Sequence, residues 1–373
     1  MSKTKRNSYE LVIVTGAGFS FPAGVPTQGQ LLYEIEKFEP DTMQPGGLRF
    51  LEAKEVVNDF LKTIFLRNYE KQGRQDDDFA RKLGVIQLED IYSLLDRAII
   101  EGDVIPPFSE TDLHKIRTSL DACIIYYMNC IQANITHKKR PLYEQLYQQF
   151  MLRYSTNWLT ITTNWDTVWD DVLISACREK DFLVDYGPNI YWIGPDSKGG
   201  KPEPNRLGPR LLKLHGSFNW LACPQCHSIF VWPTKELGLR GVFDPVRCPR
   251  CYSGSAQGLE PRLRPLFLTP SLLKTVRNPT LRIIWDEAFC ALSTTKEVIF
   301  IGYSLPIADH ELRYLLRRGI SRNTKVKVIL HKNDCPARHD KNIQLYAEYR
   351  YKSLLGLSDD DFYYGGFESF FHL

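Results

Sequence analysis

Residues 11 to 27 read LVIVTGAGFSFPAGVPT, and this stretch sets the expectation for the fold. Leu11 to Val14 form a short apolar run, which is typical of a strand buried on both faces of a parallel sheet. Gly16 and Gly18 follow at once, where a side chain would prevent close approach, and a helical pattern begins near Gln30. In nucleotide-binding folds a strand, a glycine turn and a helix place bare N–H groups against an anion. The third glycine of G-x-G-x-x-G is missing, so a simple tight turn is the alternative.

Length and charge bound the class of protein. The chain has 373 residues and 43% hydrophobic content, which suggests one large domain or two modest ones. Of these we expect a single domain over residues 1–373. The 47 basic and 44 acidic residues give a net charge of +3, which does not indicate nucleic-acid binding. No apolar stretch approaches the roughly 18 residues of a membrane span. We therefore expect a cytoplasmic protein whose nine cysteines are thiols or metal ligands rather than disulfides.

The pattern along the chain predicts an open α/β fold with a Rossmann-like parallel sheet. Residues 30–150 read as a mostly helical insertion, with Ser109 or Thr111 as a helix cap and Lys138 to Arg140 as a solvated helix end. Five segments read as strands, namely residues 11–14, 158–166, 211–216, 297–305 and 325–331. Because helices and other insertions separate these strands, a parallel sheet is the favoured arrangement.

Polar residues follow four of these predicted strands. They are Thr15, Asn164 with Asp166, His215, and Tyr303 with Ser304. In open α/β sheets the ligand crevice lies outside the carboxyl ends of the strands, so we expect these side chains to share one site. Taken singly, Asn164 or Asp166 could cap a following helix, and His215 could be a satisfied histidine at a strand end.

Four cysteines form an inserted pattern, C-x2-C-x21-C-x2-C, at Cys223, Cys226, Cys248 and Cys251. Two close pairs of thiolates suit tetrahedral zinc, and four cysteines leave no open position, so we expect a structural zinc module over residues 221–255. The alternatives are c-type haem attachment at CPQCH, four ordinary buried cysteines, and His227 as a substitute ligand.

Five motifs occur in order: GAGFSFPAGVP, TTNWD, KLHGSFNW, the cysteine insert and IGYSLP. Together they resemble the sirtuin (silent information regulator) family over roughly residues 9 to 335. The resemblance implies a parallel sheet of the sirtuin type, NAD as substrate and cleavage of the nicotinamide–ribose bond. By motif, it implies Asn164, His215 and Asp166 as catalytic residues. It implies NAD contacts from Gly16, Ala17, Gly18, Phe19, Ser20, Pro26, Thr163, Gly302, Tyr303, Ser304 and His331, as well as from the catalytic residues, with Asn333 as an alternative to His331.

The chemistry of these residue types agrees with that reaction. Departure of nicotinamide builds positive charge at the anomeric carbon of the ribose. Asn164 can position a water at that carbon, because an amide both donates and accepts hydrogen bonds. His215 can take a proton from a ribose hydroxyl or from the acceptor, and an ionised Asp166 can favour the developing charge.

Two departures from the protein-deacylating sirtuins favour a hydrolase. The first motif continues as GVPTQGQ rather than G-I-P-D-F-R, and Arg264-Pro265 is followed by LFLTPSLLK without F-G-E. The chain is therefore more similar to bacterial sirtuin-like NAD hydrolases, many of which deplete NAD in anti-phage defence. The alternatives are an NAD-dependent protein deacylase or ADP-ribosyltransferase, and a non-catalytic NAD or ADP-ribose sensor.

An NAD hydrolase needs restraint. The resemblance suggests assembly into a homo-oligomer or control by a separately encoded HerA-like ATPase. The C-terminal tail, residues 336–373, ends in the aromatic segment DFYYGGFESFFHL. We interpret this tail as a possible interface, with burial in the core as the alternative.

Overall fold

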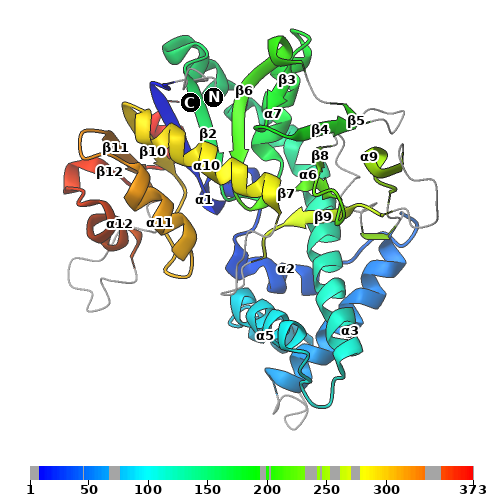
Figure 1. The fold of residues 1–373 in the computed structure, drawn as a ribbon. Helices are drawn as coiled ribbons and strands as arrows, with labels where there is room; N and C mark the ends of the chain where they lie inside the picture. Colours follow the sequence, from blue (N-terminus) through cyan, green and yellow to red (C-terminus); the bar gives the residue numbers. More distant parts are fainter. Residues whose placement is uncertain are drawn as a thin grey trace.

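The computed structural model describes residues 8–44, 46–66, 76–193, 199–200, 203–231, 242–243, 246–252, 261–269, 278–331 and 346–372. Its centre is a sheet of seven strands in the order β12-β11-β10-β1-β2-β6-β3, and every neighbouring pair is parallel. The predicted α/β fold with a Rossmann-like parallel sheet is confirmed (Figure 1). The strands are β1 (Leu11–Thr15), β2 (Trp158–Thr162), β3 (Leu183–Asp185), β6 (Leu207–Lys213), β10 (Glu297–Ile301), β11 (Lys325–Ile329) and β12 (Phe362–Tyr363).

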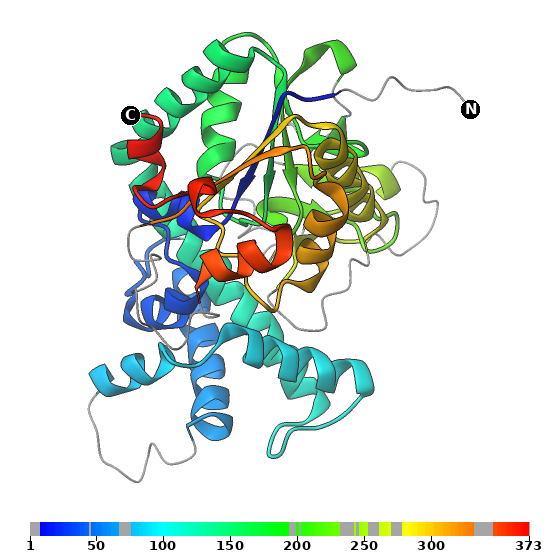
Figure 2. The same ribbon diagram turned by 90° about the vertical axis from the view of Figure 1, so that its left-hand side faces the viewer.

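Helices cover both faces of this sheet. Figure 2 shows α10 (Pro279–Thr294) and α11 (His310–Gly319) on one face, with α7 (Val168–Arg178) and the end of α6 (Glu110–Tyr154) on the other. Every residue of β1 and β2 is buried, as expected for strands enclosed by two helical layers. The apolar run that opened the sequence therefore forms the middle of the core.

A group of helices extends from one end of the sheet (Figure 1). It contains α2 (Leu31–Lys37), α3 (Gly47–Ile64), α4 (Asp76–Leu83), α5 (Leu88–Glu101) and the first half of α6. Ser109 caps α6, and its hydroxyl accepts from the amide of Asp112 while the Asp112 carboxylate accepts from Ser109. The predicted helix end at Lys138 to Arg140 is wrong, because α6 continues through these residues to Tyr154.

The sequence patterns did not reveal a second, five-stranded sheet, whose order is β5-β4-β8-β7-β9. Its strands are β4 (Ile190–Ile193), β5 (Gly199–Gly200), β7 (Gly216–Ala222), β8 (Ile229–Val231) and β9 (Arg264–Phe267), and the short α9 (Pro249–Tyr252) lies beside it. Most of these strands are too short to show a clear period of two. The sheet carries the cysteine pairs, because β7 ends immediately before Cys223.

The C-terminal segment packs on the domain. Helix α12 (Ala347–Leu355) leads to β12, which extends the large sheet beside β11, and α13 (Gly366–Phe370) follows. Tyr351 and Phe367 are fully buried, so the described part of the tail contributes to the core.

Short 3-10 turns complete the architecture: η1 (Phe21–Ala23), η2 (Gln28–Gln30), η4 (Pro204–Arg206) and η7 (Asp359–Asp361). Among the described helices, none has the length and apolarity that crossing a membrane requires.

Candidate active site

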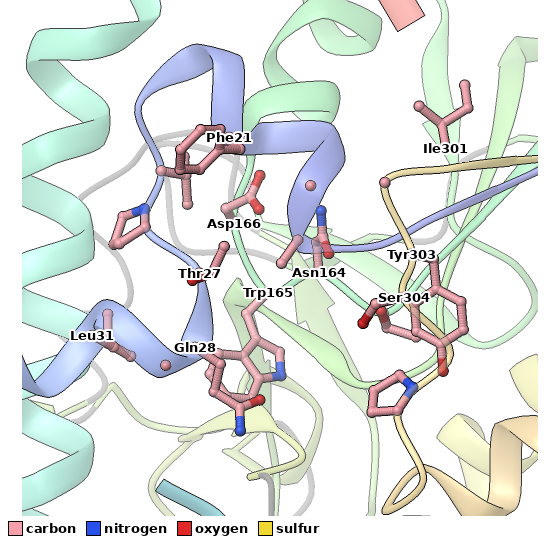
Figure 3. Close-up of a pocket in the computed structure, with 18 of the residues that line it drawn as sticks. Phe21, Thr27, Gln28, Leu31, Asn164, Trp165, Asp166, Ile301, Tyr303 and Ser304 are labelled. Carbon is pink, nitrogen blue, oxygen red and sulfur yellow. The ribbon is translucent and has the colours of Figure 1, made fainter. Parts of the chain in front are cut away.

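A cavity of about 610 Å³ lies at the carboxyl edge of the seven-stranded sheet. Because the strands are parallel, the polar residues that follow β2, β6 and β10 meet at this edge. Figure 3 shows Asn164 and Asp166 after β2, and Tyr303 and Ser304 after β10. The expectation for Thr15 is wrong, because this residue is the last of β1, is 1% exposed and does not line the cavity. The predicted strands ran too far at this edge, since β2 ends at Thr162 and β10 ends at Ile301. Of the predicted site residues, the cavity is lined by Ala17, Gly18, Pro26, Thr163, Asn164, Asp166, His215, Gly302, Tyr303, Ser304 and His331.

Three predicted site residues lie behind this wall. The ring of Phe19 packs against Tyr143, Trp169 and Phe367, so this side chain belongs to the core. Ser20 is 1% exposed and its hydroxyl donates to Asp166 at 3.0 Å. Gly16 contributes its carbonyl oxygen, which accepts a hydrogen bond from Asn164.

The glycine turn makes close backbone contacts with the turn after β10. The amide of Gly16 donates to the carbonyl of Ile301, and the amide of Gly18 donates to the carbonyl of Gly302 at 2.8 Å. Gly302 has φ of +60°, and a Cβ there would meet the Phe19 amide nitrogen at 2.2 Å. The expectation of bare N–H groups is therefore wrong for Gly16 and Gly18, because their amides are used inside the protein. These glycines allow two turns to touch and form one continuous wall.

Asn164 is held in a defined orientation. Its Nδ2 donates to the Gly16 carbonyl at 2.9 Å and to the Ser20 hydroxyl at 3.1 Å, and its backbone amide donates to Thr162 Oγ1. Figure 3 shows the amide nitrogen turned to the glycine turn and the oxygen on the opposite side. The side chain is thus fixed with its acceptor atom available to a ligand in the cavity.

Asp166 is buried beside Asn164. Burial raises the pKa of its carboxyl group, while Lys213 and hydrogen bonds from the Val168 amide and Ser20 lower it. Lys213 lies behind the site and is 0% exposed. Its ammonium donates to the backbone carbonyl of Asp166 at 2.7 Å and to the carboxylate of Asp170 at 2.8 Å. A fully buried ion pair therefore supports the loop that carries Asn164 and Asp166.

His215 is buried at the end of β6, and its backbone carbonyl accepts from the amide of Leu268 at 2.7 Å. Gly216 permits this approach, because it has φ of +72° and a Cβ there would lie 2.2 Å from the Leu266 carbonyl oxygen. Asp309, which sequence reasoning missed, faces the ring with its Oδ1 3.6 Å from Nε2. The imidazole is thus paired with a carboxylate that comes from the start of α11.

Other parts of the wall were also missed. Trp165 stands between Asn164 and Asp166, and its indole donates to the Leu268 carbonyl at 3.1 Å. The helical segment and the tail also reach the cavity, through Gln28, Gln87, Glu89, Met128, Gly366, Phe367 and Glu368. These residues carry no local signal, because their elements are brought to the cavity only by the tertiary fold.

The tail also holds the turn after β10. Arg350 donates twice to the carbonyl of Ser304, at 3.1 and 2.8 Å, and the Tyr351 hydroxyl donates to the carbonyl of Tyr303 at 2.8 Å. Two positions of this turn, Gly302 and Leu305, have left-handed backbone conformations. Helix α12 therefore satisfies the carbonyls of a strained turn that lines the cavity.

The four predicted metal ligands come together beside the five-stranded sheet. Strand β7 begins next to His215 and ends next to Cys223, the first of these ligands. The sulfur atoms of Cys223, Cys226, Cys248 and Cys251 lie within 4.8 Å of one another. Two of the separations are 3.8 and 3.7 Å, close to the roughly 3.8 Å between thiolates that hold tetrahedral zinc at about 2.3 Å. The Cys226 amide also points at the Cys223 sulfur, at 3.4 Å. The cluster fits a structural zinc site with no open position.

Neither a protein-family model nor a curated protein matches the sequence. Among solved structures, a Sir2 homologue in complex with NAD is 14% identical, with 94% of this chain and 93% of that chain covered and a TM-score of 0.42. A mutant Sir2 homologue in complex with ADP-ribose is 13% identical, with 95% and 96% covered and a TM-score of 0.38. Likenesses at this level do not transfer an activity, so the function has to be read from the cavity itself.

Proposed function

We propose that this chain binds NAD in the cavity and hydrolyses the nicotinamide–ribose bond to give nicotinamide and ADP-ribose. The observation that carries the proposal is the meeting of Asn164, Asp166 and His215 in one cavity at the carboxyl edge of the sheet. The order of the five sequence motifs, which resembles the sirtuin family, adds independent support. Isolated histidines and carboxylates are common on protein surfaces. Asn164, Asp166 and His215 are instead buried or partly buried, and all three line the same cavity.

Each group has a distinct task in this chemistry. Asn164, fixed through its Nδ2, presents Oδ1 as an acceptor that orients a water or a ribose hydroxyl. Asp166 places negative charge near the carbon that becomes positive as nicotinamide departs. His215 takes the proton that the attacking water releases. The two walls around them, the glycine turn and the turn after β10, accommodate the rest of the dinucleotide.

We favour water as the acceptor, because the sequence lacks two stretches that the resemblance associates with an acyl-lysine acceptor. The first motif continues as GVPTQGQ, and Arg264-Pro265 is followed by LFLTPSLLK. In the biological form of the proposal the chain is an NAD-depleting effector of bacterial anti-phage defence. A homo-oligomer or a HerA-like ATPase partner would restrain it, and the cysteine module would hold structural zinc.

One observation favours a second candidate, a protein deacylase. Within the described part of the chain, β9 is an outer strand of the five-stranded sheet, and Leu268, next to its end, lines the cavity. An extended acyl-peptide could add to such an edge and direct its modified lysine into the cavity. The reaction would then transfer the acyl group to the ribose.

Incubating the purified protein with NAD, with and without an acetylated peptide, separates these candidates. The hydrolase releases nicotinamide and ADP-ribose from NAD alone, and product chromatography detects both. A deacylase requires the peptide and forms O-acetyl-ADP-ribose. A sensor binds NAD in calorimetry and leaves it intact.

A further inference from the structure

We propose that Asp309 is a positioning residue for His215, a role that rests on the proposed NAD chemistry. The carboxylate would fix the tautomer of the imidazole and stabilise the cation that forms when His215 takes up a proton. Both side chains are 7% exposed, and both line the cavity. They come from distant parts of the chain, His215 from the end of β6 and Asp309 from the residue before α11.

The position of Asp309 in its helix gives an independent reason to assign it a role. Aspartate at a helix N-cap usually accepts a hydrogen bond from an amide of the first turn. Asp309 occupies the N-cap of α11 and makes no such bond. Its Oδ2 instead accepts from the Tyr303 hydroxyl at 2.8 Å, and its Oδ1 faces His215 Nε2 at 3.6 Å. The carboxylate is thus turned away from its own helix and toward the cavity.

Tyr303 fixes the carboxylate in this direction. The tyrosine is 4% exposed, and its ring lies against the glycine turn, where a Cβ on Gly16 would meet Tyr303 Cδ2 at 2.6 Å. Helix α12 holds the Tyr303 backbone through the hydroxyl of Tyr351. Arg313, one turn into α11, donates to the Leu305 carbonyl at 3.5 Å. The chain of contacts therefore runs from the tail, through Tyr303 and Asp309, to His215.

The proton step is simple to balance. In the neutral imidazole, a carboxylate beside Nε2 favours the tautomer that carries the proton on that nitrogen. When the attacking water loses its proton to the ring, an imidazolium forms beside the carboxylate. The oxygen that lost the proton bonds to the anomeric carbon, the nicotinamide bond breaks, and the ring later releases the proton to solvent. Asp309 keeps its charge throughout, as in other carboxylate–histidine pairs.

The test compares Asp309→Asn with the full-length wild-type protein. Asparagine keeps the volume, the N-cap preference and an acceptor for Tyr303, but it removes the charge. We expect kcat for NAD cleavage to fall on the order of a hundredfold while the Kd for ADP-ribose stays within about threefold. Nitrogen-15 spectra of the imidazole should show the Nε2–H tautomer of His215 in the wild type and a change of tautomer in the variant. Glu311→Gln is the matched control, because it removes the same charge from the exposed first turn of the same helix.

The outcomes separate this inference from the proposed function. A variant with wild-type kcat and an unchanged tautomer would overturn the role of Asp309. Equal losses in Asp309→Asn and Glu311→Gln would show a general effect of charge and would also overturn it. If the wild type leaves NAD intact, the proposed function fails. The tautomer measurement then still decides whether Asp309 orients His215.

Discussion

The cysteine module and the cavity are built in opposite ways. The module takes its four ligands from two C-x2-C pairs in one inserted stretch, and their sulfur atoms lie within 4.8 Å of one another. The cavity takes its groups from the ends of β1, β2, β6 and β10, from the helical segment and from the tail. A site whose ligands are close in sequence can be read from spacing alone. A site assembled from distant segments can be read only where a rule of topology brings those segments together.

The largest effect should come from breaking the module. We expect one zinc per chain, and we expect Cys248→Ser to unfold the module, because structural zinc binding is worth on the order of 10 kcal/mol in small modules. Elemental analysis of fresh protein, followed by circular dichroism with a chelator, measures both. Cys290→Ser is the control, since this partly buried cysteine lies outside the cluster. Zinc below about a tenth of an equivalent in unchelated protein would remove the claim of a zinc site.

A single substitution in the cavity should lower the activity and leave the fold intact. His215→Ala should lower NAD turnover by about a thousandfold, or roughly 4 kcal/mol of transition-state stabilisation, because a base is lost. Binding of NAD should persist, since the walls around Gly18 and Ser304 are unchanged. Calorimetry and nicotinamide release measure the two effects. A variant that binds and cleaves NAD like the wild type would remove His215 from the site.

A third substitution tests whether the buried ion pair between Lys213 and Asp170 stabilises the protein. Lys213→Met should destabilise the protein by about 3 kcal/mol, because it leaves the buried carboxylate of Asp170 without its cation. Urea unfolding measures the loss. The double variant Lys213→Met with Asp170→Asn should recover most of it, since the uncompensated charge is gone and Tyr186 keeps an acceptor. Equal stability of the wild type and Lys213→Met would show that the pair does not matter to the fold.

The smallest expected change in stability is at Asp166. Its replacement by asparagine should raise stability and lower activity. Burial raises the pKa of Asp166 above its ordinary value, so the folded state binds a proton more tightly than the unfolded state does. The ionised group therefore costs stability at neutral pH, and the cost disappears as the pH falls through the folded pKa. Asp166→Asn should raise Tm at pH 7, lower turnover, and lose its Tm advantage on acidification. Thermal unfolding over a pH series, with exposed Asp360→Asn as control, checks this; a lower Tm for Asp166→Asn at pH 7 would contradict it.

Particular residues show how far the sequence could predict the molecule. The apolar run from Leu11 to Val14 predicts β1, because a strand buried in a parallel sheet is typically an unbroken apolar run. Asn164 and His215 follow such strands, and parallel pairing then brings them to one edge. Edge strand β12 has only two residues, too few for a pattern. Asp309 looks like an ordinary helix cap, and only the fold places it beside His215.

The most direct test of the account is the release of nicotinamide from NAD alone by the wild type and by Asn164→Ala. The side-chain Nδ2 of Asn164 donates hydrogen bonds to the Gly16 carbonyl and the Ser20 hydroxyl, which fixes the orientation of the side chain. Its Oδ1 is then available to accept a hydrogen bond from the ligand. We predict nicotinamide and ADP-ribose from the wild type without an acylated peptide, and a loss of about a thousandfold in a folded Asn164→Ala protein. Turnover near the wild-type rate in that variant, or NAD consumption that strictly requires an acetylated peptide, would contradict the account.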